Sequence, residues 1–359
     1  MFSSQIRVLI IDDSAIARNS LSRILQTDPE IEVVGTAPDA LIGLKKIADC
    51  SPDVLTLDVE MPKMDGLTFL ERLMSSRPMP VVMVSAYTSE GSETALRALD
   101  LGALEIIEKP SIDVSSGLQE LALQITDKVK AAAQAKLKSP QQRFQKQHLR
   151  NSHTQLAHSE LKKISHSPSI IAIGASTGGT DSLREILAEL PTDLPGILIV
   201  QHMPKAFTPS FAKSLDRVSR IDVKEAVSGD RVKSGFALLA PGNQHLELKR
   251  DIHGYFVELT DEPLVNRHRP SVDILFESIS KCAGRDALGI LLTGMGSDGA
   301  KGLLGMRQTG AWTIAQEETS CVVYGMPRVA VELDATREIL TPWEIITRLQ
   351  LLSPKMDEE

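Results

Sequence analysis

Short apolar runs that alternate with helical stretches are the feature that most limits how this chain can fold. In the first half, runs built on Val, Ile and Leu occupy residues 7–13, 54–58, 81–85 and 105–109. After the first run, residues 14–26 carry apolar side chains at the spacing of an amphipathic helix. Strands that alternate with helices form a doubly wound parallel sheet. We therefore predict an α/β fold whose strand ends face one crevice.

Each of these four runs ends in a chemically useful side chain. The candidates are Asp12, Asp13, Asp58, Ser85 and Lys109. Three carboxylates at one edge repel one another unless a divalent cation neutralises them, and hard oxygen ligands suit Mg²⁺. Asp58, with a hydroxyl and an ammonium nearby to hold phosphoryl oxygens, then has the position of a phosphoryl acceptor. Taken singly, each residue is also consistent with a solvated strand end or a helix cap.

A strand, a glycine-rich turn and a helix begin the second half. An apolar run from residue 170 breaks into Gly-Ala-Ser-Thr-Gly-Gly and resumes with helical spacing over residues 181–190. Ser176 therefore lies at a turn where its hydroxyl can act as a nucleophile and helix N–H groups can stabilise an oxyanion. From the turn alone, helix capping by Ser176 is the simpler interpretation. A phosphate-binding loop is a second alternative, although the spacing matches neither a P-loop nor a dinucleotide fingerprint.

Two further buried strands end in an imidazole and a carboxylate. His202 follows the run 196–201, and Asp298 follows the run 287–293 after a glycine-rich segment. In a parallel sheet these ends share one edge with Ser176, so His202 would take the serine proton and Asp298 would orient His202. The N–H of Met295 is the predicted oxyanion donor. Taken singly, His202 is more simply structural and Asp298 a helix cap.

Three other residues are weaker candidates for chemistry. His245, in a predicted β-hairpin of residues 244–248 and 255–259, and His268, before a predicted helix, are alternative bases. Neither follows a long buried strand. Cys321 is an alternative thiol nucleophile, but the apolar residues after it favour burial.

Composition limits the class of protein. The 359 residues suffice for two domains, and 42% hydrophobic with 24% charged residues are typical of a soluble globular protein. Neither a membrane span nor a signal peptide is evident, so we expect a cytoplasmic protein without membrane insertion. The net charge of -8 argues against a nucleic-acid partner. The three scattered cysteines suggest neither disulfides nor zinc, and a monomer is the default expectation.

The apolar pattern is lost over residues 131–167. Glutamines, four histidines and scattered basic residues dominate this stretch, with Glu160 as its one acid. So few large apolar side chains cannot build a core. We expect a first domain at 1–134, a flexible linker at 135–167 and a second domain at 168–353. A histidine metal tract or a basic nucleic-acid arm is an alternative for the linker, but no regular ligand spacing supports it.

The segment from Ile6 to about Gln134 resembles the receiver domains of two-component response regulators, which have a flavodoxin-like fold. The resemblance rests on the strand-end residues described above. It implies phosphorylation of Asp58, with Mg²⁺ held by Asp12, Asp13 and Asp58.

The same resemblance implies roles for the other strand-end residues. Ser85 would be the switch hydroxyl and Lys109 the ammonium that contacts the phosphoryl group, and a cis peptide bond would precede Pro110. Ile106 is a departure, because many receivers carry an aromatic residue there that moves on activation. The route by which phosphorylation is transmitted is therefore open.

Residues 169–352 closely resemble the catalytic domain of chemotaxis protein-glutamate methylesterases. The matching segments are Gly-Ala-Ser-Thr-Gly-Gly179, Gln-His-Met-Pro204, Ala-Pro-Gly242 with His245, Arg-Pro-Ser-Val-Asp273, Leu-Thr-Gly-Met-Gly-Ser-Asp-Gly299 and Tyr-Gly-Met-Pro327. The resemblance implies Ser176, His202 and Asp298 as a triad, without a cofactor for the esterase reaction. It also implies γ-glutamyl methyl esters of methyl-accepting chemoreceptors as substrates, a chemotaxis histidine kinase as phosphodonor, and deamidation of receptor glutamines as a second activity.

The sequence therefore predicts a serine esterase controlled by phosphorylation. We hypothesise that the unphosphorylated receiver restricts access to the catalytic edge and that phosphorylation of Asp58 relieves the restriction. Two other classes remain as alternatives, namely a nucleotide-binding oxidoreductase that uses the Ser176 turn for phosphate, and a response regulator with a non-catalytic output. Against the first, the strand before His202 offers no acidic residue for a ribose. Against the second, no helix-turn-helix pattern is evident.

Overall fold

The computed structural model describes residues 5–85, 89–110, 118–137 and 167–353. These residues divide into two compact units, one within residues 1–142 and one within residues 143–359. Most of the predicted linker, residues 138–166, lies outside the described residues. Within the described part, no helix is both long and apolar enough to cross a membrane.

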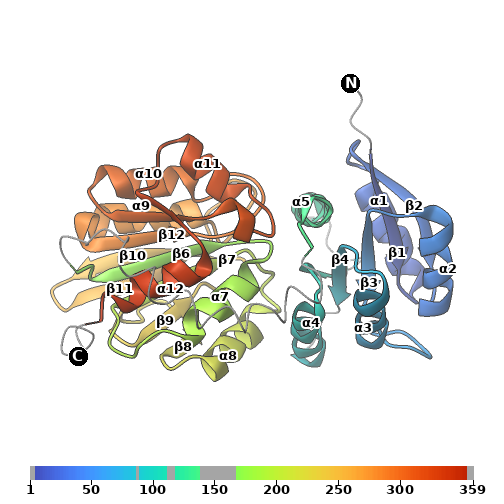
Figure 1. Ribbon diagram of the computed structural model, residues 1–359, viewed down its shortest axis with the longest axis horizontal. Coiled ribbons are helices and arrows are strands. Elements are labelled where there is room, and N and C mark those ends of the chain that lie inside the picture. Colours follow the sequence, from blue (N-terminus) through green and yellow to red (C-terminus); the bar gives the residue numbers. More distant parts are fainter. Residues whose placement is uncertain (1–4, 86–88, 111–117, 138–166, 354–359) are drawn as a thin grey trace. The chain divides into compact units, whose positions relative to one another are not determined.

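The first unit is a five-stranded sheet in which each strand is followed by a helix (Figure 1). Its elements are β1 (Ile6–Ile11), α1 (Ala15–Leu25), β2 (Ile31–Ala37), α2 (Ala40–Cys50), β3 (Val54–Asp58), α3 (Gly66–Ser76), β4 (Val81–Ser85), α4 (Ser89–Leu101), β5 (Glu105–Glu108) and α5 (Leu118–Gln134). The strand order is β2-β1-β3-β4-β5, and all pairs are parallel. The predicted doubly wound receiver fold is confirmed.

Burial on both faces explains why these strands are apolar throughout. Val8, Leu9, Ile10 and Ile11 of β1 are fully buried, as expected for a parallel strand covered by helices on both sides. Ser14 ends the turn after β1 and caps α1, since its side chain accepts from the N–H of Ala17. The carboxylates of the first strand therefore lie just beyond its end.

The second unit is a seven-stranded parallel sheet with a separate hairpin. Its strands and helices are β6 (Ile170–Ala175), α7 (Gly179–Ala188), β7 (Gly196–Gln201), α8 (Thr208–Val218), β8 (Asp222–Glu225), β9 (Phe236–Leu239), β10 (His245–Asp251), β11 (Gly254–Thr260), α9 (Val272–Cys282), β12 (Ala287–Leu291), α10 (Ala300–Gln308), β13 (Trp312–Gln316), α11 (Met326–Glu332), β14 (Glu338–Leu340) and α12 (Pro342–Gln350). Short 3₁₀ turns cover Gly284–Asp286 and Glu318–Ser320. The antiparallel pair β10–β11 is the predicted hairpin.

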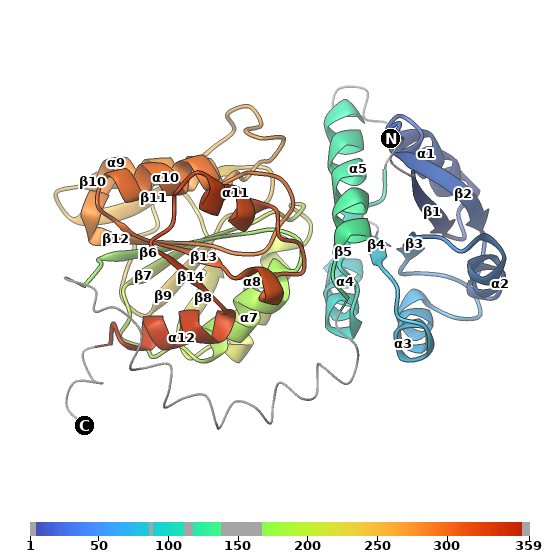
Figure 2. The ribbon, with the colours of Figure 1, turned by 45° about the horizontal axis from the view of Figure 1, so that its top comes forward.

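The strand order places the candidate catalytic strands side by side. It runs β14-β13-β12-β6-β7-β9-β8, so β6 lies between β12 and β7 at the centre of the sheet. Helices α9, α10 and α11 cover one face of this sheet, and α7, α8 and α12 cover the other (Figures 1 and 2). The carboxyl ends of β6, β7 and β12 therefore meet at one central position, where open α/β sheets bind their ligands.

Candidate active site

Ser176 directly follows β6 in a turn that only glycine can complete. Its N–H donates to Thr293 O at 3.0 Å, and Gln201 Nε2 donates to its carbonyl at 3.0 Å. Gly178 has φ 77°, and a Cβ there would lie 2.4 Å from Val322. The N-cap of α7 is Gly178, with no side-chain capping bond, so Ser176 is not the helix cap that the turn alone suggested. Ser176 is 8% exposed.

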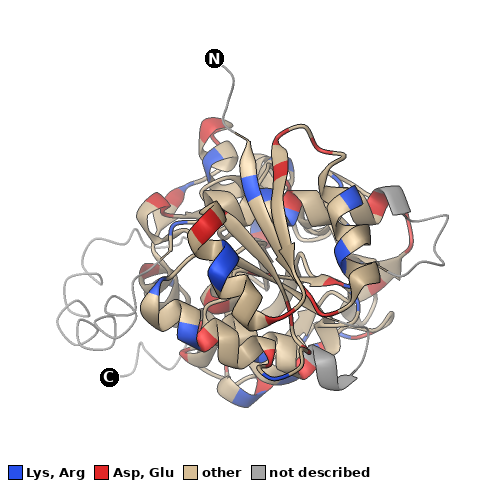
Figure 3. Ribbon diagram, turned by 90° about the vertical axis from the view of Figure 1, so that its right-hand side faces the viewer, with Lys and Arg blue, Asp and Glu red and all other residues tan. Residues whose placement is uncertain are grey.

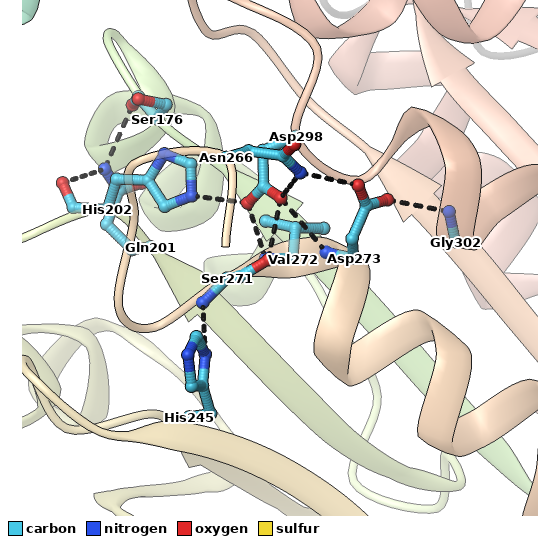
Figure 4. Close-up of polar contacts among 10 residues, drawn as sticks. All are labelled: Ser176, Gln201, His202, His245, Asn266, Ser271, Val272, Asp273, Asp298 and Gly302. Carbon is cyan, nitrogen blue, oxygen red and sulfur yellow. Dashed lines mark hydrogen bonds and ion pairs between the residues drawn. The ribbon is translucent and has the colours of Figure 1, made fainter. Parts of the chain in front are cut away.

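His202 lies beside this turn and contacts Asp298. Its N–H donates to Ala175 O at 3.1 Å, and its Nε2 lies 2.9 Å from Asp298 Oδ2 (Figure 4). Because the carboxylate accepts, Nε2 carries the proton and the Nδ1 lone pair is directed elsewhere. The described residues give the buried Nδ1 no hydrogen-bond partner. Catalytic hydrogen bonds often form fully only when substrate is bound, and Nδ1 is the atom available to Ser176.

Asp298 is the centre of a network of donors (Figure 4). The donors are His202 Nε2 at 2.9 Å, Asn266 Nδ2 at 2.8 Å, Ser271 Oγ at 2.7 Å and the N–H groups of Val272 at 2.6 Å and Asp273 at 3.4 Å. Burial by itself raises the pKa of Asp298, but the hydrogen bond and charge of His202, with the Asn266 bond, outweigh it and hold the pKa below its usual value. Asp298 is therefore ionised.

The network also corrects the capping role considered for Asp298. Helix α10 is capped by Gly299 without a side-chain bond. Asp298 instead accepts from the first N–H groups of α9, whose N-cap is Ser271. The positive end of α9 thus faces the carboxylate, which adds to its stabilisation.

A second carboxylate lies beside Asp298. Asn266 Nδ2 donates to Asp273 Oδ2 at 2.7 Å as well as to Asp298, and the N–H of Gly302 donates to Asp273 at 2.7 Å. Burial raises the pKa of Asp273, and the charge of Asp298 adds to the increase, against the hydrogen bond from Gly302. Asn266 therefore lies between two carboxylates and separates their charges.

The loop after β12 brings Gly294, the residue before Met295, next to Ser176. A Cβ on Gly294 would lie 2.6 Å from Ser176 Cβ and 2.3 Å from Met326 Sδ, so only glycine allows this approach. No acceptor for the Met295 N–H is found among the described residues. This N–H is therefore available to an oxyanion.

The alternative residues have other surroundings. His245 is fully buried and both its ring nitrogens are engaged: Nδ1 accepts from the N–H of Ser271 at 3.1 Å, and Nε2 lies 3.0 Å from Pro263 O. His268 stacks on His202, with ring centroids 3.7 Å apart. Cys321 is 1% exposed. Sequence reasoning missed Asn266 and assigned no role to Ser271 and Gln201, although both lie in segments that resemble the family, because their contacts come from segments distant in the sequence.

The acidic cluster of the first unit gathers at the ends of β1 and β3. Asp12, Asp13 and Asp58 each offer an oxygen within 4.8 Å of the others. Lys109 Nζ lies 2.6 Å from Asp58 Oδ2 and 3.3 Å from Asp12 Oδ2. Among the described residues, Lys109 is the one ammonium in contact with Asp12 and Asp58, and its 3.3 Å ion pair with buried Asp12 Oδ2 lacks hydrogen-bond geometry. This donor set fits Mg²⁺, which takes hard oxygen ligands and would balance the excess negative charge.

Burial and like charge also perturb these carboxylates. Burial raises the pKa of Asp58 to about 6, against the hydrogen bond from Lys109, and the charge of Asp12 adds to the increase. Burial raises the pKa of Asp12 as well, while Lys109 lowers it in part. A cation bound at the cluster would stabilise the charged carboxylates and so lower both pKa values.

The remaining receiver expectations have mixed outcomes. Ser85, at the end of β4, is 1% exposed, and its carbonyl accepts from the N–H of Lys109 at 2.8 Å. Ile106 is buried, with 2% exposure. The expected cis bond before Pro110 is wrong: the one cis peptide bond among the described residues joins Arg269 and Pro270.

Comparisons with known proteins agree with this geometry in both units. The family model described as the response regulator receiver domain matches residues 8–120, and the model described as CheB methylesterase matches residues 171–349. The chain is therefore a response regulator whose output domain is an enzyme domain.

Individual relatives extend the match over nearly the whole chain. A protein-glutamate methylesterase/protein-glutamine glutaminase of Geobacter metallireducens is 51% identical over 97% of this chain and 96% of its own length. One of Escherichia coli O157:H7 is 50% identical over 94% of each chain. The crystal structure of the Thermotoga maritima CheB methylesterase catalytic domain is 38% identical, with a TM-score of 0.51, and covers 52% of this chain and 100% of its own. The chain belongs to the CheB protein-glutamate methylesterase family.

Proposed function

We propose that this chain is a phosphorylation-activated protein-glutamate methylesterase that acts on methyl-accepting chemoreceptors and also deamidates receptor glutamines. The names of the relatives support both activities. The observation that most directly supports serine chemistry is the His202–Asp298 contact of 2.9 Å beside a serine turn, where the described residues offer Nδ1 no partner. The family match favours neither a nucleotide-binding oxidoreductase nor a non-catalytic regulator.

In the first step, Ser176 attacks the glutamyl ester carbonyl. His202 Nδ1 takes the hydroxyl proton while the Oγ–carbon bond forms, and Asp298 stabilises the resulting imidazolium. The Met295 N–H donates to the carbonyl oxygen as it becomes negative. The carbon–methoxy bond then breaks, and the imidazolium proton passes to the departing methoxy oxygen, which releases methanol.

In the second step, water hydrolyses the glutamyl-enzyme. His202 takes a proton from water as the new carbon–oxygen bond forms, and returns it to Ser176 Oγ when the ester bond to the enzyme breaks. A glutamine side chain gives the same acyl-enzyme, because only the leaving group differs. In that case the carbon–nitrogen bond breaks, and the imidazolium proton of His202 passes to the departing amide nitrogen, which leaves as ammonia.

In the receiver, Asp58 is the proposed phosphoryl acceptor. Asp12, Asp13 and Asp58 would hold Mg²⁺, which supplies charge neutralisation for phosphoryl transfer. Lys109 and Ser85 would contact the phosphoryl oxygens. A chemotaxis histidine kinase is the proposed phosphodonor.

The protein is proposed to act in the cytoplasm as a monomer without a nucleic-acid partner. Acidic and basic residues are interspersed along the described ribbon (Figure 3). Together with the net charge of -8, this mixed charge supports a protein rather than a nucleic-acid partner.

Methanol release from methylated receptor membranes tests the reaction and its nucleophile together. Intact protein with a small-molecule phosphodonor and Mg²⁺ should release methanol, and the Ser176→Ala variant should not. Release by the variant would remove Ser176 as nucleophile. Unmethylated receptors that carry glutamines at the modified positions should release ammonia, and an absence of ammonia would remove the second activity.

The Asp58→Asn variant tests control by phosphorylation. It should lose the stimulation by phosphodonor, expected to be about 5- to 150-fold for a typical coupling between sites, and should keep unstimulated activity. The matched control is Asp49→Asn, an exposed position of α2, which should respond as the wild type does. Stimulation of Asp58→Asn would contradict the assignment.

A further inference from the structure

The rings of His268 and His202 are stacked. Their centroids lie 3.7 Å apart and their planes differ by 14°. The proton-accepting lone pair of an imidazole lies in the ring plane, so two rings stacked in this way cannot exchange a proton directly. His268 is therefore not a second base for His202, and its contact is with the ring face.

His202 needs a restraint of this kind. Among the described residues, its side chain has one hydrogen bond, from Nε2 to Asp298. This bond and the covalent attachment at Cγ still allow the ring to tilt about the line that joins Cγ and Nε2, and a tilt would change the direction of the Nδ1 lone pair. A flat group packed against one face of the His202 ring blocks this movement, because the ring would collide with that group if it left the parallel arrangement.

The loop that carries His268 is built to hold it in place. Val265 and His268 exchange backbone hydrogen bonds of 3.1 and 2.9 Å. Between them, Asn266 and Arg267 both have positive φ, 51° and 69°, which is uncommon for residues other than glycine. Such backbone conformations persist where the surroundings fix them and are frequent at functional sites.

Long-range contacts anchor the loop on its other side. Arg269 donates through Nε and Nη2 to Asn243 Oδ1 at 3.1 and 2.8 Å, and through Nη1 to the carbonyls of Asp261 and Glu262 at 3.2 and 3.0 Å. The N–H of Asn243 donates back to Arg269 O at 3.0 Å. The loop thus holds the His268 ring, and its Asn266 amide binds Asp298.

We propose that His268 is a positioning residue that fixes the plane of the His202 ring by stacking, so that Nδ1 faces Ser176 during both steps of the reaction. The inference rests on the proposed function of Ser176 and His202. One loop then orients two groups of the site. Its His268 orients the ring of His202, and its Asn266 orients the carboxylate of Asp298.

Three variants of the full-length protein test the proposal, each assayed for methanol release with phosphodonor and Mg²⁺. His268→Ala removes the ring and should lower kcat about 10- to 100-fold, as a misplaced catalytic group does, with KM little changed. His268→Phe keeps a flat ring without nitrogens and should recover most of the loss. His253→Ala, at the exposed tip of the β10–β11 hairpin, is the matched control and should equal the wild type.

Active-site titration with a serine-directed acylating reagent gives the concentration of competent enzyme in each preparation, so a folding defect is separated from a slower reaction. Full activity in His268→Ala, or a loss in His268→Phe as large as in His268→Ala, would overturn the stacking role. If Ser176→Ala is inactive while His268→Ala is unimpaired, the inference alone fails. If Ser176→Ala is active, the proposed function itself fails.

Discussion

Two buried aspartates at the ends of buried strands have opposite electrostatic surroundings. Asp58 in the first unit and Asp298 in the second are each 1% exposed. The pKa of Asp58 is raised to about 6, whereas that of Asp298 is lowered. Burial raises the pKa in both cases, so the difference comes from the partners.

The partners differ in number and in charge. In the part of the chain that the structure describes, Asp58 has one cationic partner, Lys109, which it shares with Asp12. Asp298 accepts from five groups, two of them N–H groups at the start of α9. The negative charge of Asp58 is only partly compensated, so this carboxylate favours a bound cation. The negative charge of Asp298 is compensated by its five hydrogen-bond donors. The first carboxylate is suited to take up Mg²⁺ and a phosphoryl group, and the second to hold an imidazolium without reacting.

The largest effect should come from Asp298→Asn. The amide offers one acceptor oxygen to donors that now share two, and its NH₂ group would oppose either His202 Nε2–H or the N–H groups of α9. We expect kcat to fall about 10³-fold or more, as when the carboxylate of a Ser-His-Asp arrangement becomes an amide. Methanol release at saturating substrate measures this. The control variant Asp222→Asn, at an exposed edge-strand position, should leave kcat unchanged. An equal loss of kcat in this control would show that the loss in Asp298→Asn does not come from the surroundings of Asp298.

A smaller effect, on stability, should come from Asp58→Asn without Mg²⁺. The folded pKa of Asp58 is raised from 3.8 to about 6, so its contribution to stability is present below about pH 4 and is lost as the pH rises through about 6. Relative to the variant, wild-type receiver stability should fall by about 3 kcal/mol between about pH 4 and about pH 7. Added Mg²⁺ should restore part of it.

Hydrogen exchange of peptides from β3 measures this change. Tryptophan fluorescence does not, because the two tryptophans, Trp312 and Trp343, lie in the second unit. A pH-independent difference between wild type and Asp58→Asn would show that burial and Asp12 do not disfavour the charge on Asp58.

The smallest effect should come from Asn266→Gly. Glycine tolerates the φ of 51° at this position, so the change mainly removes the amide between Asp273 and Asp298. Asp298 keeps its other donors, and we expect kcat to fall about tenfold, the value of one hydrogen bond to a charged group. The kcat of methanol release tests this. A loss of kcat as large as in Asp298→Asn would mean that kcat depends on the separation of Asp273 from Asp298 and not on the number of hydrogen-bond donors to Asp298.

The fold could be predicted from the sequence because buried parallel strands have a strong local signal. The predicted run 7–13 overlaps β1 over residues 7–11, and the predicted helix 14–26 contains α1, with Ser14 as its cap. The hairpin β10–β11 was also predicted. Strands β2, β8, β9, β13 and β14 were not predicted. In β8 and β14 few residues are buried, so their apolar pattern is weak.

The main candidate residues have a local signal in the sequence, because each lies at the end of a strand or in the loop after one. Their supporting residues could not be predicted in this role, because Asn266, Ser271 and Gln201 act through contacts with segments distant in the sequence. The role of Asp298 shows the same limit. Its position before α10 suggested a cap for that helix, but the tertiary structure directs it to α9.

The contacts between Asp298 and the start of α9 make two backbone amides natural reporters of the catalytic carboxylate. The N–H groups of Val272 and Asp273 both donate to Asp298, so their chemical shifts and their exchange with solvent depend on its charge and position. An NMR spectrum of the isotope-labelled protein would thus follow the state of the catalytic centre as phosphodonor is added, without any substrate present.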